Sequence, residues 1–312
     1  MKSDGKIIVV GSDDTAYQLC LLSMTALQLE EIYLFPSSSQ QDDKVDDLHY
    51  VSELFSTNKL KIATEKDFSE AKMLILTARE TRLENEPESE YIRRNILLVR
   101  KIVNRIMASG FNGLFLVANE MNDLFTYLVW KFSGLPKSKI FGIGTYIDTV
   151  YFQKLLSDTL EVSFCDVKGY IIGGRKPTQK IAAWSRSSIG GNSLLGLIMD
   201  PSIAISQENM FEIEEKLNKQ NLTNENSELT VTTATAVLKL VQFILTNEKA
   251  VVPLVHLMDI GEMKDIPLSV PVLLGESGIR QLVGLNFSDT EQKDLLTIAK
   301  EIRTQLDWIE QG

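Results

Sequence analysis

The chain has 312 residues, of which 44% are hydrophobic and 24% are charged, and its formal net charge is −10. This composition is typical of a globular protein with a large core, arranged as one large domain or as two of ordinary size. The negative charge argues against nucleic acid or an anionic membrane as a partner, because neutralising phosphates requires clustered lysine and arginine.

In the first half of the chain, short apolar runs alternate with helix-period segments, which predicts β-α units and a parallel sheet. The predicted strands lie at residues 6–10, 31–35, 73–77, 114–118 and 140–144. A long helix is predicted over 88–109. The second half predicts short antiparallel strands separated by turns. Its predicted helices lie at about 206–219, 230–246 and 288–311.

The two cysteines, Cys20 and Cys165, stand in apolar stretches without metal-ligand spacing. They indicate buried thiols in a reducing cytosol, and no metal site is expected. No apolar run reaches the roughly 18 residues of a membrane span, and no signal-like block precedes the first predicted strand. We therefore expect a cytoplasmic protein.

The stretch KIIVVGSDDTA has the outline of a strand, turn and helix that binds a dinucleotide. The fingerprint G-x-G-x-x-G is represented by Gly11, Asp13 and Ala16. Ala16 is a tolerated exchange, whereas Asp13 puts a carboxylate where the backbone approaches the pyrophosphate. Two like charges about 4 Å apart repel by about 4 kcal/mol at an effective dielectric constant near 20. The sequence thus predicts weak or absent dinucleotide binding, with Asp13 capping the helix instead.

A resemblance to the lactate and malate dehydrogenase family begins at GLFLVANEMNDLFTYLVWKFSGLPKSKIFGIGTYIDTVYFQKLLSD. It continues through YIIGGRKPTQKIAAWS, VVPLVHLMD and SVPVLLGESGI, and so covers essentially the whole chain. It implies an α/β fold in two parts. Residues 1–142 would form a Rossmann-type parallel sheet with helices on both faces, and residues 143–312 a mixed α+β substrate domain.

The resemblance also assigns the catalytic positions of this chain, and most of them carry other residues. Arg175 stands where the family has its proton-transferring histidine, and an arginine stays protonated at ordinary pH. Tyr151 replaces the arginine that holds the substrate carboxylate, whereas Asp148, the orienting aspartate, is retained. Pro36 replaces the acidic residue that binds the adenosine ribose.

The family's mobile loop aligns with residues 77–95 and is altered as well. Glu88 replaces the transition-state arginine, and Glu120 replaces an asparagine. Leu83 occupies the substrate-discriminating position. Two arginines are thus lost and two carboxylates gained, which predicts a pocket that opposes an anionic substrate.

Other basic side chains can in principle compensate for these losses. Arg79 and Arg82, together with the arginine that replaces the histidine, can form a new anion clamp, although surface positions are the favoured interpretation. The two histidines, His49 and His256, are interpreted as structural. Lys176 is the one histidine, cysteine or lysine at a matching position.

Three hypotheses for function follow. The leading one is a catalytically degenerate family member, a pseudoenzyme with a structural or regulatory role and no cofactor. The alternative is an NAD-dependent oxidoreductase that acts on the CH–OH group of a 2-hydroxy acid, with altered substrate or cofactor. The third is a regulatory partner of an active paralogue. The resemblance also implies a homo-oligomer, either a dimer or a tetramer.

Overall fold

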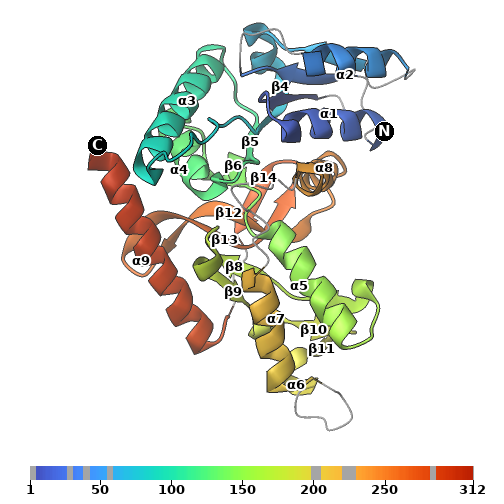
Figure 1. Cartoon of the computed structure of the whole chain (residues 1–312), viewed down its shortest axis with the longest axis vertical. Helices are drawn as coiled ribbons and strands as arrows, with labels where there is room; N and C mark the ends of the chain where they lie inside the picture. Colours follow the sequence, from blue (N-terminus) through green and yellow to red (C-terminus); the bar gives the residue numbers. More distant parts are fainter. Residues whose placement is uncertain are drawn as a thin grey trace. The chain divides into compact units, whose positions relative to one another are not determined.

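The computed structural model describes residues 5–26, 31–37, 43–54, 59–197, 205–219, 230–281 and 286–311 (Figure 1). The chain divides into two compact units. Unit 1 comprises Met1–Ile143, Leu229–Ala250 and Leu274–Ile279. Unit 2 comprises Gly144–Glu228, Val251–Leu273 and Arg280–Gly312. The units therefore do not follow a single cut after residue 142, because two later segments of the chain join unit 1.

Unit 1 contains a parallel sheet in the order β3-β2-β1-β4-β5-β6. Its strands are β1 (Lys6–Val10), β2 (Glu31–Phe35), β3 (Lys59–Ile62), β4 (Ala71–Leu76), β5 (Leu114–Val117) and β6 (Ile140–Gly142). Nearly every residue of β1, β4 and β5 is buried, as expected for strands covered on both faces. Chain order reverses on the two sides of β1, which makes the β1/β4 crevice the topological switch point of the sheet.

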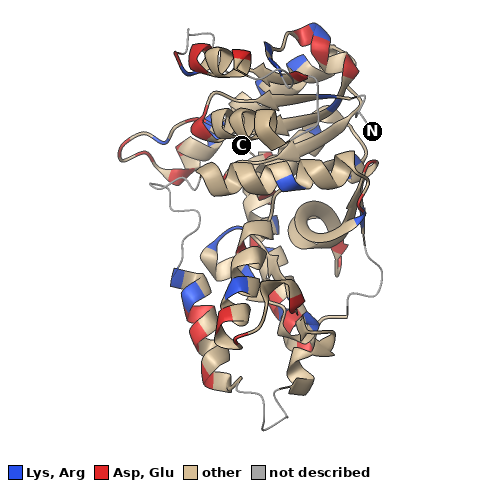
Figure 2. Ribbon diagram, turned by 90° about the vertical axis from the view of Figure 1, so that its right-hand side faces the viewer, with Lys and Arg blue, Asp and Glu red and all other residues tan. Residues whose placement is uncertain are grey.

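Helices of unit 1 cover this sheet. They are α1 (Asp14–Ala26), α2 (Asp43–Glu53), α3 (Glu88–Ala108), α4 (Asn122–Ser133) and α8 (Thr230–Leu245). The late helix α8 packs against α1, and the two are drawn next to each other in Figure 1. Figure 2 shows α8 as an almost uncharged helix, and Lys239 is its one charged residue. Its apolar surface explains why it belongs to unit 1 rather than to the part of the chain around it.

Unit 2 contains a sheet in the order β12-β13-β8-β9, with β14 paired to β13. Its strands are β8 (Ile171–Gly173), β9 (Lys180–Ala182), β12 (Ala250–Ile260), β13 (Met263–Gly275) and β14 (Gly278–Gln281). The pairs β13-β8 and β8-β9 are antiparallel. A second, small antiparallel sheet consists of β7 (Val167–Lys168), β10 (Ser188–Ile189) and β11 (Asn192–Ser193).

In the described part of unit 2, four α-helices accompany these sheets. They are α5 (Tyr146–Thr159), α6 (Leu194–Leu197), α7 (Gln207–Lys219) and α9 (Asp289–Gln311). Short 3-10 helices in the two units span Glu65–Glu70, Lys137–Lys139, Phe164–Asp166, Pro177–Gln179 and Trp184–Arg186. An apolar cluster joins α5, α6 and α7, with Phe152 and Trp184 in edge-to-face contact at 5.1 Å. The predicted fold class, a parallel Rossmann-type sheet followed by a mixed α+β part, is confirmed. Over the described residues, no helix combines the length and the hydrophobicity of a membrane span.

One buried ionisable group in unit 2 has an incomplete set of hydrogen bonds. His256 in β12 is 4% exposed, and its Nδ1 lies 3.3 Å from the carbonyl oxygen of Leu254. Its Nε2 has no hydrogen-bond partner among the described residues. Burial lowers the pKa of this imidazole, because the charged form loses its hydration.

We predict that His256 makes the protein less stable in acid. The pKa of His256 is lower in the folded than in the unfolded state. Its contribution to the free energy of unfolding is therefore complete above about pH 6.5, and it is lost as the pH falls toward the folded pKa, because the unfolded chain takes up the proton first. Each tenfold difference between the two ionisation constants is worth about 1.4 kcal/mol. The difference in unfolding free energy between His256→Leu and the natural protein should therefore shift in favour of the variant when the pH is lowered from 7.5 to 5. Urea unfolding at both pH values measures this, and an equal difference at the two would contradict it.

Candidate functional site

The turn between β1 and α1 is fastened to both neighbouring strands. The N–H of Gly11 donates to the carbonyl oxygen of Phe35 at 3.1 Å, and the N–H of Thr77 donates to that of Val10 at 3.1 Å. A Cβ on Gly11 would lie 2.0 Å from Thr77 Oγ1, so the close approach requires glycine. The first fingerprint glycine thus serves the packing of β1 against the end of β4.

Asp13 lies in this turn, immediately before α1. Thr77 Oγ1 donates to its Oδ1 at 2.5 Å, a bond that connects the turn after β1 to the residue after β4. Burial raises the pKa of the Asp13 carboxyl, opposed by the hydrogen bond from Thr77 and by the charge of Arg79. The Asp13–Thr77 bond therefore crosses the switch-point crevice, which is where ligands bind in open α/β sheets.

Glu120, which follows β5, is also paired. The hydroxyl of Tyr91 donates to its Oε1 at 2.5 Å, and Arg79 Nη1 lies 3.8 Å from the same oxygen. Burial, followed by this hydrogen bond, raises the pKa of Tyr91 to about 12. Arg79 is only 17% exposed and attracts both Glu120 and Asp13, so it is not a simple surface charge.

The loop before α3 is held by one arginine of that helix. Arg94 donates to both carboxylate oxygens of Glu86, at 2.7 and 2.9 Å, and to Glu80 at 2.9 Å. Arg94 holds the pKa of the Glu86 carboxyl below its usual range. Glu88 and Leu83 of the same region are exposed.

In unit 2, Asp148, which the family resemblance assigns as the orienting aspartate, has a lysine partner. Lys180 Nζ donates to Asp148 Oδ1 at 2.7 Å, and the two side chains are only 6% and 10% exposed respectively. Asp148 lies in the first turn of α5, whereas Lys180 begins β9 and pairs with Gly173 of β8. The β8-β9 hairpin therefore delivers the lysine to the aspartate.

Lys180 was not predicted from the sequence, where Lys176 was the one lysine that stood at a position matching the family's catalytic set. The arginine and lysine at positions 175 and 176 lie half-buried in the connection between β8 and β9. Tyr151 packs against the apolar cluster around Phe152. One signal in the sequence was available: a retained aspartate in an apolar helix needs a cation, and a short hairpin places residue 180 opposite residue 173.

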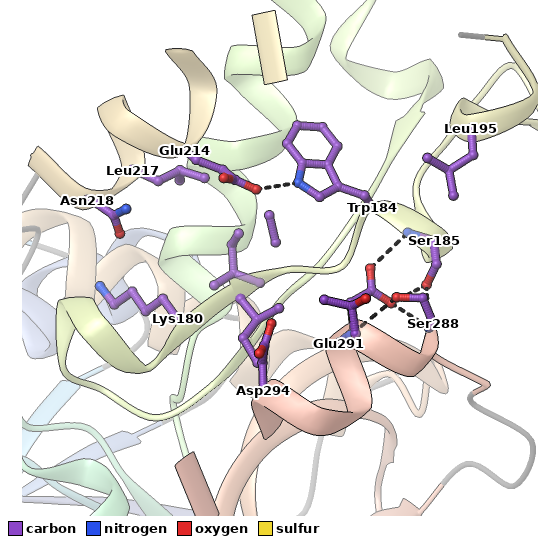
Figure 3. A pocket seen from close by; sticks show the side chains of 14 residues that line it. Lys180, Trp184, Ser185, Leu195, Glu214, Leu217, Asn218, Ser288, Glu291 and Asp294 are labelled. Carbon is purple, nitrogen blue, oxygen red and sulfur yellow. Dashed lines mark hydrogen bonds between the residues drawn. The ribbon is translucent and has the colours of Figure 1, made fainter. Parts of the chain in front are cut away.

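A pocket of about 410 Å³ in unit 2 borders on Lys180 (Figure 3). Its apolar wall consists of Ile171, Ile181, Ala182, Trp184, Leu195 and Leu217. The indole Nε1 of Trp184 donates to Glu214 at 2.6 Å. On the opposite side, Glu291 accepts from the N–H groups of Ser185 and Ser288, at 3.0 and 2.7 Å. Burial would raise the pKa of Glu291, but the hydrogen bonds from the Ser185 hydroxyl and from the N–H groups of Ser185 and Ser288 outweigh it and lower this pKa.

The predicted site residues fall into two groups. Gly11, Asp13, Ala16, Pro36, Glu88 and Glu120 belong to unit 1, whereas Asp148, Tyr151 and Arg175 belong to unit 2. Arg79 brings Asp13 and Glu120 into one electrostatic group. No set of three or more histidine, cysteine, aspartate or glutamate side chains within the described ranges is arranged to hold a metal ion.

The chain matches known proteins over nearly its whole length. The family model for the lactate/malate dehydrogenase NAD-binding domain matches residues 5–142, and that for the α/β C-terminal domain of the same family matches residues 145–311. L-lactate dehydrogenase 1 of Listeria innocua is 32% identical over 318 residues, covering 98% of each chain. L-lactate dehydrogenase of Halalkalibacterium halodurans is 28% identical, covering 97% of this chain and 96% of its own.

Among solved structures, the ligand-bound minor L-lactate dehydrogenase of Enterococcus mundtii superposes with a TM-score of 0.88 at 25% identity. The match covers 98% of this chain and 99% of that one. A lactate dehydrogenase from a deep-sea metagenome library has the same fold, with a TM-score of 0.88 at 24% identity and coverage of 98% of both chains.

We predict that Lys180 and Asp148 depend on each other for stability. Lys180→Met leaves a buried carboxylate unpaired and should lower the free energy of unfolding by about 3–5 kcal/mol. The double variant Lys180→Met/Asp148→Leu should recover most of this loss, because two apolar side chains carry no desolvation penalty. Urea unfolding of the natural protein, both single variants and the double variant gives the coupling energy. Additive losses would contradict the prediction.

Proposed function

Because the chain belongs to the lactate/malate dehydrogenase family, we propose that it is an NAD-dependent oxidoreductase that acts on the CH–OH group of a 2-hydroxy acid, with a substrate other than lactate or malate. The observation that carries this proposal is the match at 32% identity over 98% of an L-lactate dehydrogenase. The expectation that the protein has no cofactor is not supported, since residues 5–142 match an NAD-binding domain.

The residues around the switch-point crevice fit a dinucleotide. The glycine at position 11 allows the turn to approach β4 closely, and the N-terminus of α1 favours an anion. Asp13 opposes the phosphates only while it is ionised, and burial raises its pKa. A protonated carboxyl can instead donate a hydrogen bond. When bound, NAD supplies the hydride donor or acceptor.

Pro36 removes one contact that the family resemblance implies. It follows the last residue of β2 and carries no carboxylate for a ribose hydroxyl. Such a hydrogen bond to a charged group is worth roughly 1.5–3 kcal/mol. We therefore propose weaker NAD binding than an acidic residue at this position would give, rather than no binding.

The substrate side of the proposal rests on how the replaced residues are held. Tyr151 packs on the apolar cluster of unit 2 and offers no charge to a carboxylate. Glu120 shares its charge with Arg79 and the Tyr91 hydroxyl, so it opposes an anion less than an isolated carboxylate does. These contacts support a substrate whose carboxylate is held differently from that of lactate.

The second candidate is the pseudoenzyme, and one observation favours it. Arg175 stands at the histidine position of the family and cannot release a proton at ordinary pH. Loss of a general acid/base alone costs typically 10² to 10⁴ in rate. A pseudoenzyme of this kind would bind NADH without transferring a hydride.

Assembly into a dimer or tetramer stays a prediction, as does a place in the cytoplasm. Helix α2 supports the first, because Tyr50 of this helix and Leu54, which follows its last residue, are 75% and 85% exposed. Exposed large apolar side chains that lie close together are typical of surfaces that another chain covers.

We predict that NADH binds more tightly as the pH falls from 7.5 to 5.5. The phosphates favour the protonated form of Asp13, so affinity should rise by up to about tenfold per pH unit as the pH approaches the raised pKa of this group. Asp13→Asn should bind more tightly than the natural protein at pH 7.5 and show a flatter pH dependence. Asp14→Asn, which changes the neighbouring exposed carboxylate, is the control and should behave like the natural protein. Calorimetric titration measures both, and equal affinities of the natural protein at the two pH values would contradict the mechanism.

We predict measurable oxidation of NADH with at least one member of a panel of 2-oxo acids that differ in side-chain size and charge. Turnover on pyruvate and oxaloacetate should lie well below the median of about 10 per second for enzymes. Absorbance at the NADH band follows the reaction. If NADH binds but no member of the panel reacts, the pseudoenzyme is the correct function.

A further inference from the structure

We propose that Lys180 carries the proton in the reaction of this protein, in the role that the missing histidine has in its family. The inference rests on the proposed function, because a proton carrier requires a hydride transfer. Lys180 Nζ is bonded to the one retained member of the family's catalytic set, Asp148, at 2.7 Å. The family's aspartate orients a proton-transferring group, and here it orients a lysine.

The choice of residue type supports this role. Arginine at position 175 holds its proton at any ordinary pH, whereas a lysine ammonium can release one. His256, the histidine of unit 2, bonds through its Nδ1 to a carbonyl oxygen of its own strand and lies in a different part of the sheet, on β12. His49 belongs to α2 of unit 1. Within the described part of unit 2, the Asp148–Lys180 pair therefore joins the retained aspartate to a releasable proton.

The energetics of the pair also favour a functional role. Burying two charges costs several kcal/mol per ion before they attract each other, and apolar replacements of such a pair are often neutral or stabilising. A pair at 6% and 10% exposure is thus a weak source of stability as a unit. The presence of a buried lysine beside Asp148 is explained when the lysine reacts.

The Lys180 side chain also lines a cavity of unit 2. It borders the 410 Å³ pocket, and Figure 3 shows its side chain along the wall of that pocket. The other charged groups of the pocket are Glu214 on α7 and Glu291 and Asp294 on α9. Together with Asp148 on α5, these are the carboxylates that line the pocket or pair with Lys180.

In the direction of reduction, the substrate carbonyl carbon receives a hydride from NADH, which is oxidised to NAD⁺. The carbonyl oxygen receives a proton from the Lys180 ammonium, and the substrate becomes an alcohol. Lys180 is left as a neutral amine beside Asp148 and is reprotonated from water. In the oxidative direction, the neutral amine accepts the hydroxyl proton.

The test compares variants that keep or remove the releasable proton. Lys180→Arg keeps a cation beside Asp148 and should reduce kcat by 10² to 10⁴ while NADH binding and thermal stability stay close to those of the natural protein. Lys176→Arg, four residues earlier, is the matched control and should keep its activity. If Lys180→Arg remains active within tenfold, the inference is wrong even though the proposed function stands.

A second variant tests the proton itself. Lys180→Cys in a Cys20→Ala/Cys165→Ser background can be alkylated with 2-bromoethylamine in urea, which gives a lysine analogue with a less basic amine, and then refolded. Activity should return, and the basic limb of the pH–rate profile should move to lower pH. A purely structural lysine would leave this limb in place, which would overturn the inference.

A third readout does not depend on turnover. In protein labelled with [ε-¹³C]lysine, the Lys180 resonance, assigned by its absence in Lys180→Arg, should titrate at the same pH as the basic limb of the natural protein. Different midpoints would contradict proton transfer by Lys180. If the natural protein neither binds NADH nor reduces any 2-oxo acid of the panel, the proposed function itself fails and the inference falls with it.

Discussion

The requirement that a partly or fully buried carboxylate finds a partner organises both groups of site residues. Removing a carboxylate from water is costly unless hydrogen bonds or a cation replace its hydration. Asp13 is met by Thr77, Glu120 by Tyr91 and Arg79, and Asp148 by Lys180. Each partner comes from a different element than its carboxylate. These contacts therefore fix the loops at the ends of the strands as well as the charges of the site.

This pairing changes the electrostatic expectation drawn from the sequence. Counted as letters, two arginines are lost and two carboxylates gained, which predicts strong opposition to an anion. In the folded chain, Arg79 attracts both Glu120 and Asp13, and burial raises the pKa of Asp13. Glu88 is exposed, where solvent weakens its field. The sum of charges along the sequence does not give the electrostatic field at the site, because the partner and the burial of each charged side chain determine how strongly it acts on an anion.

Much of the fold could be predicted from the sequence, because long apolar runs bounded by turns determine β1, β2, β4, β5 and β6. The edge strand β3 could not, since its KLKI sequence carries two lysines and lacks the apolar run of a central strand. The place of α8 in unit 1 depends on packing against α1, far away in the sequence. Lys180 was missed for a similar reason: its partnership with Asp148 exists only once the β8-β9 hairpin sets its register.

The Asp148–Lys180 pair finally joins stability to chemistry. The resemblance implies that Arg175 replaces the family's histidine, and this replacement alone would leave Asp148 buried and short of a partner, at a cost of about 3–5 kcal/mol. A lysine at position 180 removes that cost by ionic pairing at 2.7 Å. Any residue that supplied a cation would do as much, including an arginine. Arginine would pair with Asp148 but would keep its proton, whereas lysine can both pair and release a proton. The identity of residue 180 therefore distinguishes a structural partner of Asp148 from a proton carrier.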